Sequence, residues 1–340
     1  MALIAPTYEM VQPSYMMPDI IMPYSQESGA FHLLAGGEPR VMIGTDDLVV
    51  YMKRLDVRTK SSMGQAAYNV LNGPDIVASM IQAPTYLIRV HTEYDHHDQA
   101  AAGRWGFSLA DATRLANQQA VVNISRTLLL YGGNPANGEG LINANGAVAI
   151  TLPPDSYGNT TASTYDNGQM AQFFQTMVLN VKIRTNNLGI GRKFVFCGPQ
   201  RILGQFGYNI VQLVQYQRAG AGSTSTFGVV EEVLMSNGDT VMFTYDDTLI
   251  GKGAGGTDMV ILTMPEVERP RVMTPQWSTN RFTDLTPSIS ATTLQFCDMP
   301  VPREITAPLA YGAQDTLFEE RVTPGWAVRP EAVTLLSISP

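Results

Sequence analysis

The sequence predicts an α+β protein with about two domains, and three features carry this prediction. An uninterrupted helical pattern runs through residues 109–131. Several short runs alternate apolar and polar residues, as strands with one buried face do. The chain has 340 residues, of which 44% are apolar and 15% are charged, and this is the composition of a globular protein with a substantial core.

The N-terminal segment, residues 1–37, contains no Lys or Arg, so it lacks the basic region of a secretory signal. Prolines at positions 6, 13, 18 and 23 exclude a helix there, and hence a membrane span. Its many Met and Tyr side chains must pack against another surface, because the segment cannot form a core of its own. We expect an extended arm that a neighbouring subunit covers, with a disordered tail as the alternative.

Two segments before the helix alternate in the manner of strands: Leu55 to Lys60 and Tyr86 to Glu93. In the second, Tyr86, Ile88 and Val90 share one face and the charged residues share the other. The stretch between them, 61–83, carries enough apolar residues for a helical turn or two.

The long helix is predicted to begin at Leu109 and to end at Tyr131. Ser108 and Asp111 fit a capping box, and Gly132 supplies the positive φ that commonly ends a helix. Its first half carries a narrow stripe of mostly small residues, whereas large apolar residues cover most sides of its second half. We therefore expect the first half on a surface and the second half in the core.

Residues 146–300 are predicted to form a second domain. Its helix follows from apolar residues with helical spacing, which are Met170, Phe173, Phe174, Met177, Val178 and Val181. A buried strand follows at Lys193 to Cys197, and Pro199 opens another helix, which implies a helix on each side of a sheet. Asn237-Gly238 predicts a hairpin between residues 229–235 and 240–245.

The end of the long helix also carries a resemblance to a known family. Tyr131-Gly132, a polar loop, and then Gly140-Leu141 and Asn143 form a "-YG-…-GLxN-" pattern. A strand and a turn with Gly103, Trp105 and Gly106 precede the helix, and closing strands in residues 318–339 end the chain. This order resembles the major capsid proteins of tailed bacteriophages, the Johnson-fold shell proteins, which are related to encapsulins.

The resemblance implies the phage major-capsid (Johnson) fold with four parts. They are an N-terminal arm (1–45), an extended loop with flanking strands (46–98), a peripheral domain with the spine helix (99–145 and 301–340), and an axial domain (146–300). The two alternating segments, Leu55 to Lys60 and Tyr86 to Glu93, would then be the arms of the extended loop. Residues 318–339 would close the peripheral domain.

The resemblance also implies a structural function, not an enzymatic one. The chain would be the subunit of an icosahedral virus head that self-assembles, as pentamers and hexamers, into the shell enclosing double-stranded DNA. Implied partners are scaffolding, portal and decoration proteins, and DNA bound without sequence specificity; no membrane is implied. The chain would be located in the virion, after assembly in the host cytoplasm. The net charge of −8 agrees with a wall that does not grip DNA. An encapsulin-type compartment is the alternative with the same fold.

A third hypothesis is a metal-dependent enzyme that uses the cluster at His91, Glu93, Asp95, His96, His97 and Asp98. Alternate residues on one strand face can ligate a metal, but a solvated or inter-subunit strand face has the same composition. No second group of ligands is identifiable in the sequence. We therefore assign no metal, cofactor or catalytic residues.

Other chemical motifs are incomplete. Gly251-Lys252-Gly253 lacks the upstream Gly and the Ser or Thr of a phosphate-binding loop, and predicts a flexible loop. Cys197 and Cys297 are too few for a disulfide framework and predict buried thiols. Lys53 and Lys60 lie where some capsids of the family form cross-links between subunits, but no matching Asn and acid can be identified.

Overall fold

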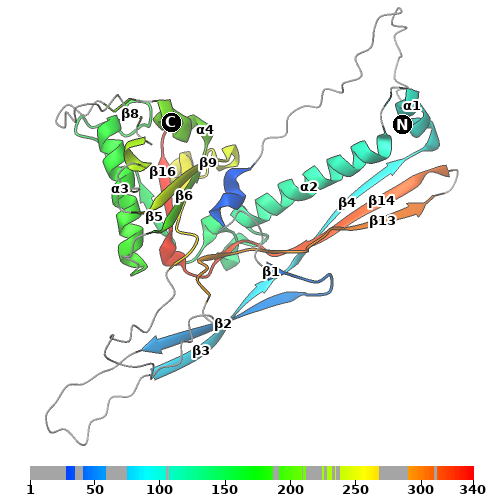
Figure 1. Ribbon diagram of the computed structural model, residues 1–340, viewed down its shortest axis with the longest axis horizontal. Helices are drawn as coiled ribbons and strands as arrows, with labels where there is room; N and C mark the ends of the chain where they lie inside the picture. The colour runs from blue at the N-terminus through cyan, green and yellow to red at the C-terminus, as the bar shows by residue number, and fades with distance from the viewer. Residues whose placement is uncertain are drawn as a thin grey trace, which may run out of the picture.

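The structure is a computed structural model in which two sheets are joined by one long helix, and a two-stranded hairpin stands away from both (Figure 1). It describes residues 28–34, 41–58, 75–104, 106, 108–186, 191–208, 210–211, 224–225, 228–231, 234, 238–267, 290–309 and 312–340. No helix within these ranges is both long enough and apolar enough to cross a membrane.

The first sheet has five strands and is centred on β14, which pairs with β12, β13 and β4. Its strands are β1 (Val41–Met42), β4 (Tyr86–Tyr94), β12 (Cys297–Asp298), β13 (Arg303–Pro308) and β14 (Gln314–Val322). β4 and β14 run antiparallel from the pair Tyr86 and Val322 to the pair Tyr94 and Gln314. A short helix, α1 (His96–Arg104), follows β4.

The second sheet also has five strands, in the order β5, β16, β10, β6, β9. They are β5 (Val148–Thr151), β6 (Lys193–Gly198), β9 (Thr240–Tyr245), β10 (Asp258–Thr263) and β16 (Val333–Ile338). All six residues of β16 are buried, because its neighbours and the layers on both sheet faces cover it. The closing residues 318–339 thus divide between the two sheets, with β14 in the first and β16 in the second.

Helix α2 (Leu109–Tyr131) has the predicted bounds. Ser108 caps its N-terminus by accepting a hydrogen bond from the N–H of Asp111, and Gly132 ends it with φ of 70°. The residues that it buries lie one turn apart, namely Asn117, Val121, Ser125 and Leu129, together with Leu130. As expected, the second half contributes most to the core and Ala112 and Ala116 of the small-residue stripe are exposed. Val122 and Ile124 of the second half, expected in the core, are exposed as well.

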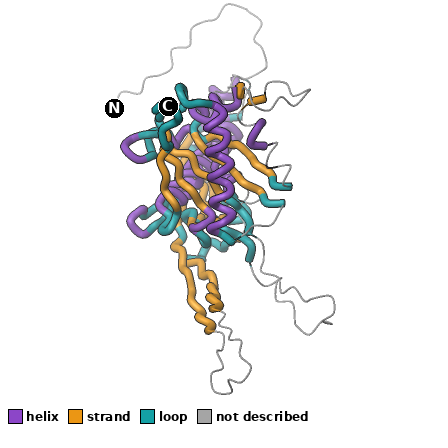
Figure 2. Tube along the Cα trace, turned by 90° about the vertical axis from the view of Figure 1, so that its left-hand side faces the viewer, coloured by secondary structure: helices purple, strands orange, loops and turns teal. Residues whose placement is uncertain are grey.

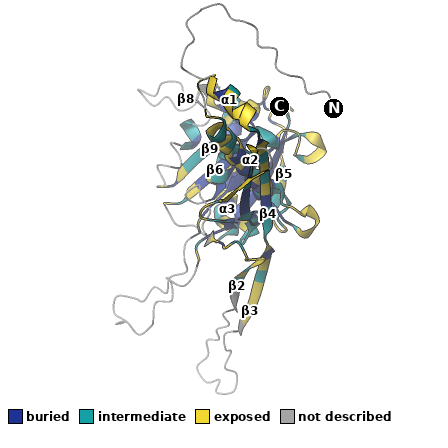
Figure 3. Ribbon diagram, turned by 90° about the vertical axis from the view of Figure 1, so that its right-hand side faces the viewer, coloured by how far each residue is buried: buried dark blue, intermediate teal, exposed yellow. Residues whose placement is uncertain are grey.

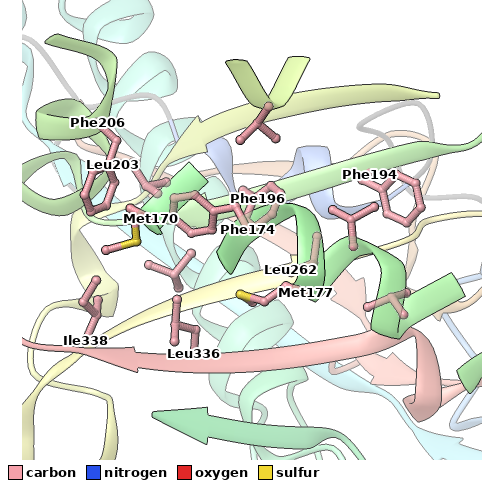
Figure 4. Packing of buried hydrophobic residues seen from close by; sticks show 14 of the residues in the cluster. Met170, Phe174, Met177, Phe194, Phe196, Leu203, Phe206, Leu262, Leu336 and Ile338 are labelled. Atoms are coloured by element: carbon pink, nitrogen blue, oxygen red, sulfur yellow. The ribbon is translucent and has the colours of Figure 1, made fainter. Parts of the chain in front are cut away.

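Two apolar layers cover the two faces of the second sheet. Helices α3 (Asn167–Arg184) and α4 (Gln200–Tyr208) lie on the same face, where Phe174 meets the rings of Phe196 and Phe206 edge-on (Figure 4). The end of α2 covers the other face with Leu129 and Leu130. The expected arrangement of one flanking helix on each face is wrong for α3 and α4, because Pro199 starts α4 on the face that α3 already covers.

The residues before the first sheet add to this second layer. Ala30, Leu33 and Leu34 are buried against α2 and the second sheet in the same subunit. Residues 1–27 lie outside the described ranges, and the expected arm therefore stays a prediction there. For Ala30, Leu33 and Leu34 the expected cover by a neighbouring subunit is wrong, since the chain's own core covers them.

The hairpin consists of β2 (Val49–Arg58) and β3 (Asp75–Pro84), paired over all ten positions. The strand predicted at Leu55 is confirmed, but the returning arm is β3 and not Tyr86 to Glu93, which pairs with β14 as β4. The helical turn expected within 61–83 is wrong for residues 75–83, which form strand β3, and its remainder lies outside the described residues.

The hairpin predicted around Asn237-Gly238 is also wrong. Residues 228–231 are helical, and β9 pairs in parallel with β6. Val230 and Leu234 are both buried, one helical turn apart. A short apolar run fits a helix and a strand equally well, and burial of these two side chains favours the helix.

The loop of the "-YG-…-GLxN-" pattern is held to the helix end and to the first sheet by hydrogen bonds of Glu139 and Asn143. The Glu139 carboxylate accepts hydrogen bonds from the Tyr86 hydroxyl at 2.9 Å and from the Asn134 N–H at 2.7 Å. The Asn143 amide donates to the carbonyls of Tyr131 and Glu139, both at 3.0 Å. The pattern thus closes the loop that turns the chain from α2 toward the second sheet.

Candidate assembly surfaces

The hairpin is the candidate functional surface, because it is attached to the body at one end only (Figures 1 and 2). Its two strands form a sheet of their own, without another described strand at either edge. A two-stranded hairpin in water is marginally stable by itself. Unpaired edges of this length are also places where another chain can add a strand.

Exposed residues lie along this hairpin (Figure 3), and some of them are large and apolar. Tyr51 is 64% exposed and Met80 is 68% exposed. Opposite residues of an antiparallel pair share a face, and Tyr51 pairs with Gln82 while Lys53 pairs with Met80, so Tyr51 and Met80 are diagonal neighbours on one face. Within the described residues, no element covers this face.

Helix α2 also exposes large apolar side chains, on either side of its buried stripe. Leu115, Val122 and Ile124 are each at least 39% exposed. Isolated exposed apolar residues are ordinary, but groups of them on two separate elements are typical of protein–protein contacts. The hairpin and the helix are therefore candidate partners in contacts between copies of the chain.

A pair of acids, of which Glu320 is buried and Asp298 is half-buried, lies where the first sheet meets the chain that leads into the hairpin. Asp298 on β12 lies beside β1 and pairs with Val322 of β14. Burial, followed by the hydrogen bond to Asp298 and its charge, raises the pKa of Glu320 to about 9 from its ordinary value of 4.5. Glu320 is thus protonated at neutral pH and can donate a hydrogen bond to Asp298.

This pair predicts that stability falls as pH rises from about 5 to about 9, the window between the two pKa values of Glu320. There the folded state holds one more proton than the unfolded state, so raising the pH favours unfolding. Thermal unfolding at a series of pH values should show this slope, and Glu320→Gln should flatten it. Glu319→Gln removes a neighbouring carboxylate bound to Arg89 and should leave the slope in place; an equal slope in Glu320→Gln would contradict the assignment.

The His and acid cluster divides into two groups in the structure. His91 and Glu93 lie on β4 near Asp315 of β14, and Asp95, His96 and His97 lie together at the start of α1. Asp98 accepts a hydrogen bond from the Asp95 N–H. Sequence reasoning missed Asp315, because the contact depends on the register between two strands that are 224 positions apart.

The structure also places the lysines and cysteines that the sequence singled out. Lys252 lies 5.3 Å from the centre of the Tyr131 ring, and the loop around it forms short turns instead of the expected flexible loop. Both thiols are buried as predicted, and burial raises the pKa of Cys197 to about 12, so it is a poor nucleophile. Lys53 is exposed on the hairpin, and Lys60 lies outside the described residues.

Comparison with known proteins identifies the architecture. No protein-family model matches the sequence, and no curated protein matches it. The capsid of Myoviridae phage XM1 is similar in structure, with a TM-score of 0.66, 12% identity and coverage of 95% of this chain and 96% of that chain. A chain of Microbacterium phage Oxtober96 has a TM-score of 0.57 at 11% identity, covering 96% of both chains. The capsid structure of cyanophage P-SCSP1u has a TM-score of 0.56 at 10% identity, covering 95% of this chain and 92% of that one. The chain therefore has the phage major-capsid (Johnson) fold.

Proposed function

We propose that the chain is the repeated shell subunit of an icosahedral virus head. The observation that carries this proposal is the hairpin, which projects from a body of the phage capsid fold and exposes Tyr51 and Met80. The exposed apolar side chains of a projecting hairpin are removed from water when another copy of the chain covers them, and symmetric assembly repeats this contact. The activity is self-association, and no catalytic residues are assigned.

The proposal extends to the parts and partners of the shell. Residues 1–45 contain the arm, whose end at residues 30–34 packs on its own subunit, and residues 46–98 contain the extended loop with its flanking strands. Residues 99–145 and 301–340 act as the peripheral domain and 146–300 as the axial domain, with β16 contributed to the axial sheet. The copies form pentamers and hexamers, with scaffolding, portal and decoration proteins as further partners. The shell assembles in the host cytoplasm and encloses double-stranded DNA in the virion without sequence-specific binding.

Electron microscopy and sedimentation of the expressed chain test this function. We expect pentamers, hexamers or closed shells, both in the producing cells and after purification. A chain that stays monomeric at high concentration, with no shells in the cells, would contradict the proposal. The contents of shells isolated from the natural source separate a virus head, which holds a DNA genome, from an encapsulin-type compartment, which holds a protein cargo.

A further inference from the structure

The outer face of the first sheet brings together three metal-ligand side chains near the end where β4 leads into α1. Glu93 lies directly opposite Asp315 in the strand register, and His91 lies two residues before Glu93 on the same face. The His91 Nε2 atom is 2.7 Å from Asp315 Oδ1 and 3.6 Å from Glu93 Oε1. One ligand atom from each residue lies within 4.8 Å of the other two.

These separations are close to those of a metal site. Zinc binds His nitrogen and carboxylate oxygen at about 2.0–2.2 Å, so tetrahedral ligands lie roughly 3.3 Å from one another. The contact of His91 with Glu93 already has this length, and that with Asp315 needs to widen by about half an ångström. Rotation of the His91 side chain can supply this change, since His91 and Glu93 are more than half exposed.

The Asp315 carboxylate adds a separate observation. Its Oδ1 atom is shielded from water, and the polar atom beside it is His91 Nε2, at 2.7 Å. Such an atom is costly unless a cation or a donor satisfies it. The residue of β13 paired with Asp315 is Ala307, whose methyl group is too short to extend over the cluster. Ala307 therefore adds no competing ligand or charge to the cluster.

We infer that His91, Glu93 and Asp315 form a three-ligand site for a divalent transition-metal ion, with zinc as the best match. One imidazole and two carboxylates leave a fourth position for water. The ion joins β4 to β14, so it stabilises the outer end of the sheet. The inference rests on the folded subunit alone and does not depend on the proposed shell function.

The second group, Asp95, His96 and His97, provides a matched control. These three residues are consecutive, and the Asp95 carboxylate already accepts a hydrogen bond from the His96 N–H at 2.6 Å. This group offers two imidazoles and one carboxylate, but no ligand from a second strand.

Zinc titration of the full-length chain without an affinity tag, followed by calorimetry, tests the site. We expect saturable binding of one equivalent, a higher melting temperature with zinc, and weaker binding at acidic pH, because His must be neutral to bind the ion. His91→Ala and Asp315→Asn should each weaken binding by at least about tenfold, since loss of an outer partner alone costs 10–100-fold. His97→Ala should bind as the parent chain does, and calcium, which needs six or more oxygen ligands, should not compete.

Circular dichroism establishes that each variant is folded, and Glu93→Gln serves as a third ligand variant if either of the others is not. Absence of saturable zinc binding to the parent chain would overturn the inference. Binding that survives His91→Ala but is lost in His97→Ala would also overturn it, because the ion would then belong to the group at the start of α1.

Discussion

Replacing Gly140 with Ala is expected to destabilise the chain by more than about 4 kcal/mol, in the range of the most damaging single substitutions. Gly140 has φ of 85°, and an added Cβ would lie 2.3 Å from the Tyr131 carbonyl carbon and 2.5 Å from the Gly132 nitrogen. Real Cβ contacts of this kind do not fall below 3.0 Å, and both atoms belong to backbone that cannot rotate away. The Gly140 N–H also donates to the Gly325 carbonyl at 2.8 Å, so movement of the loop breaks the contact with the C-terminal chain.

Gly158→Ala separates the two causes of this loss, which are the left-handed backbone and the clash of the added Cβ with neighbouring backbone. Gly158 has nearly the same φ, 86°, but no atom lies within 4 Å of an added Cβ. This variant should lose only the cost of left-handed backbone, about 1–3 kcal/mol. Urea unfolding of both variants measures the difference. Equal losses at the two positions would show that the close packing of the loop against the helix end contributes nothing.

Local signals in the sequence were sufficient for the helices. The bounds of α2 follow from the Ser108 cap and Gly132, and α3 follows from six apolar residues with helical spacing, five of which are fully buried in the structure. Both signals act between residues that are close in sequence. The α+β class and the order of the elements were predictable for the same reason.

Pairings between distant strands were not predictable. Tyr86 to Glu93 alternates as strongly as a hairpin arm does, yet it pairs with β14 because Thr85 alone separates it from β3, which occupies the hairpin. The position of β16 between β5 and β10 likewise depends on contacts with residues far away in the chain. The candidate metal site was predictable in part: His91 and Glu93 are two residues apart in the sequence, whereas Asp315 comes from a distant strand.

The hairpin surface gives the second large effect, which concerns assembly and not folding. Changing Tyr51 and Met80 together to Glu should abolish shell formation while leaving the subunit folded. Each side chain is more than 60% exposed in the single subunit, so charges there cost little in the free chain. In a contact between copies they would be buried without partners, which costs several kcal/mol each, and a closed shell repeats this cost at every subunit.

Tyr157→Glu is the matched control, because Tyr157 is 81% exposed on a loop outside the hairpin. Sedimentation and electron microscopy should find shells from the control and free subunits from the Tyr51 and Met80 variant, with equal melting temperatures for the unassembled chains. Normal shell yield from the hairpin variant would show that this face makes no essential contact. A variant that unfolds would instead place Tyr51 and Met80 against their own subunit, because only burial within the same chain makes two added charges costly before assembly.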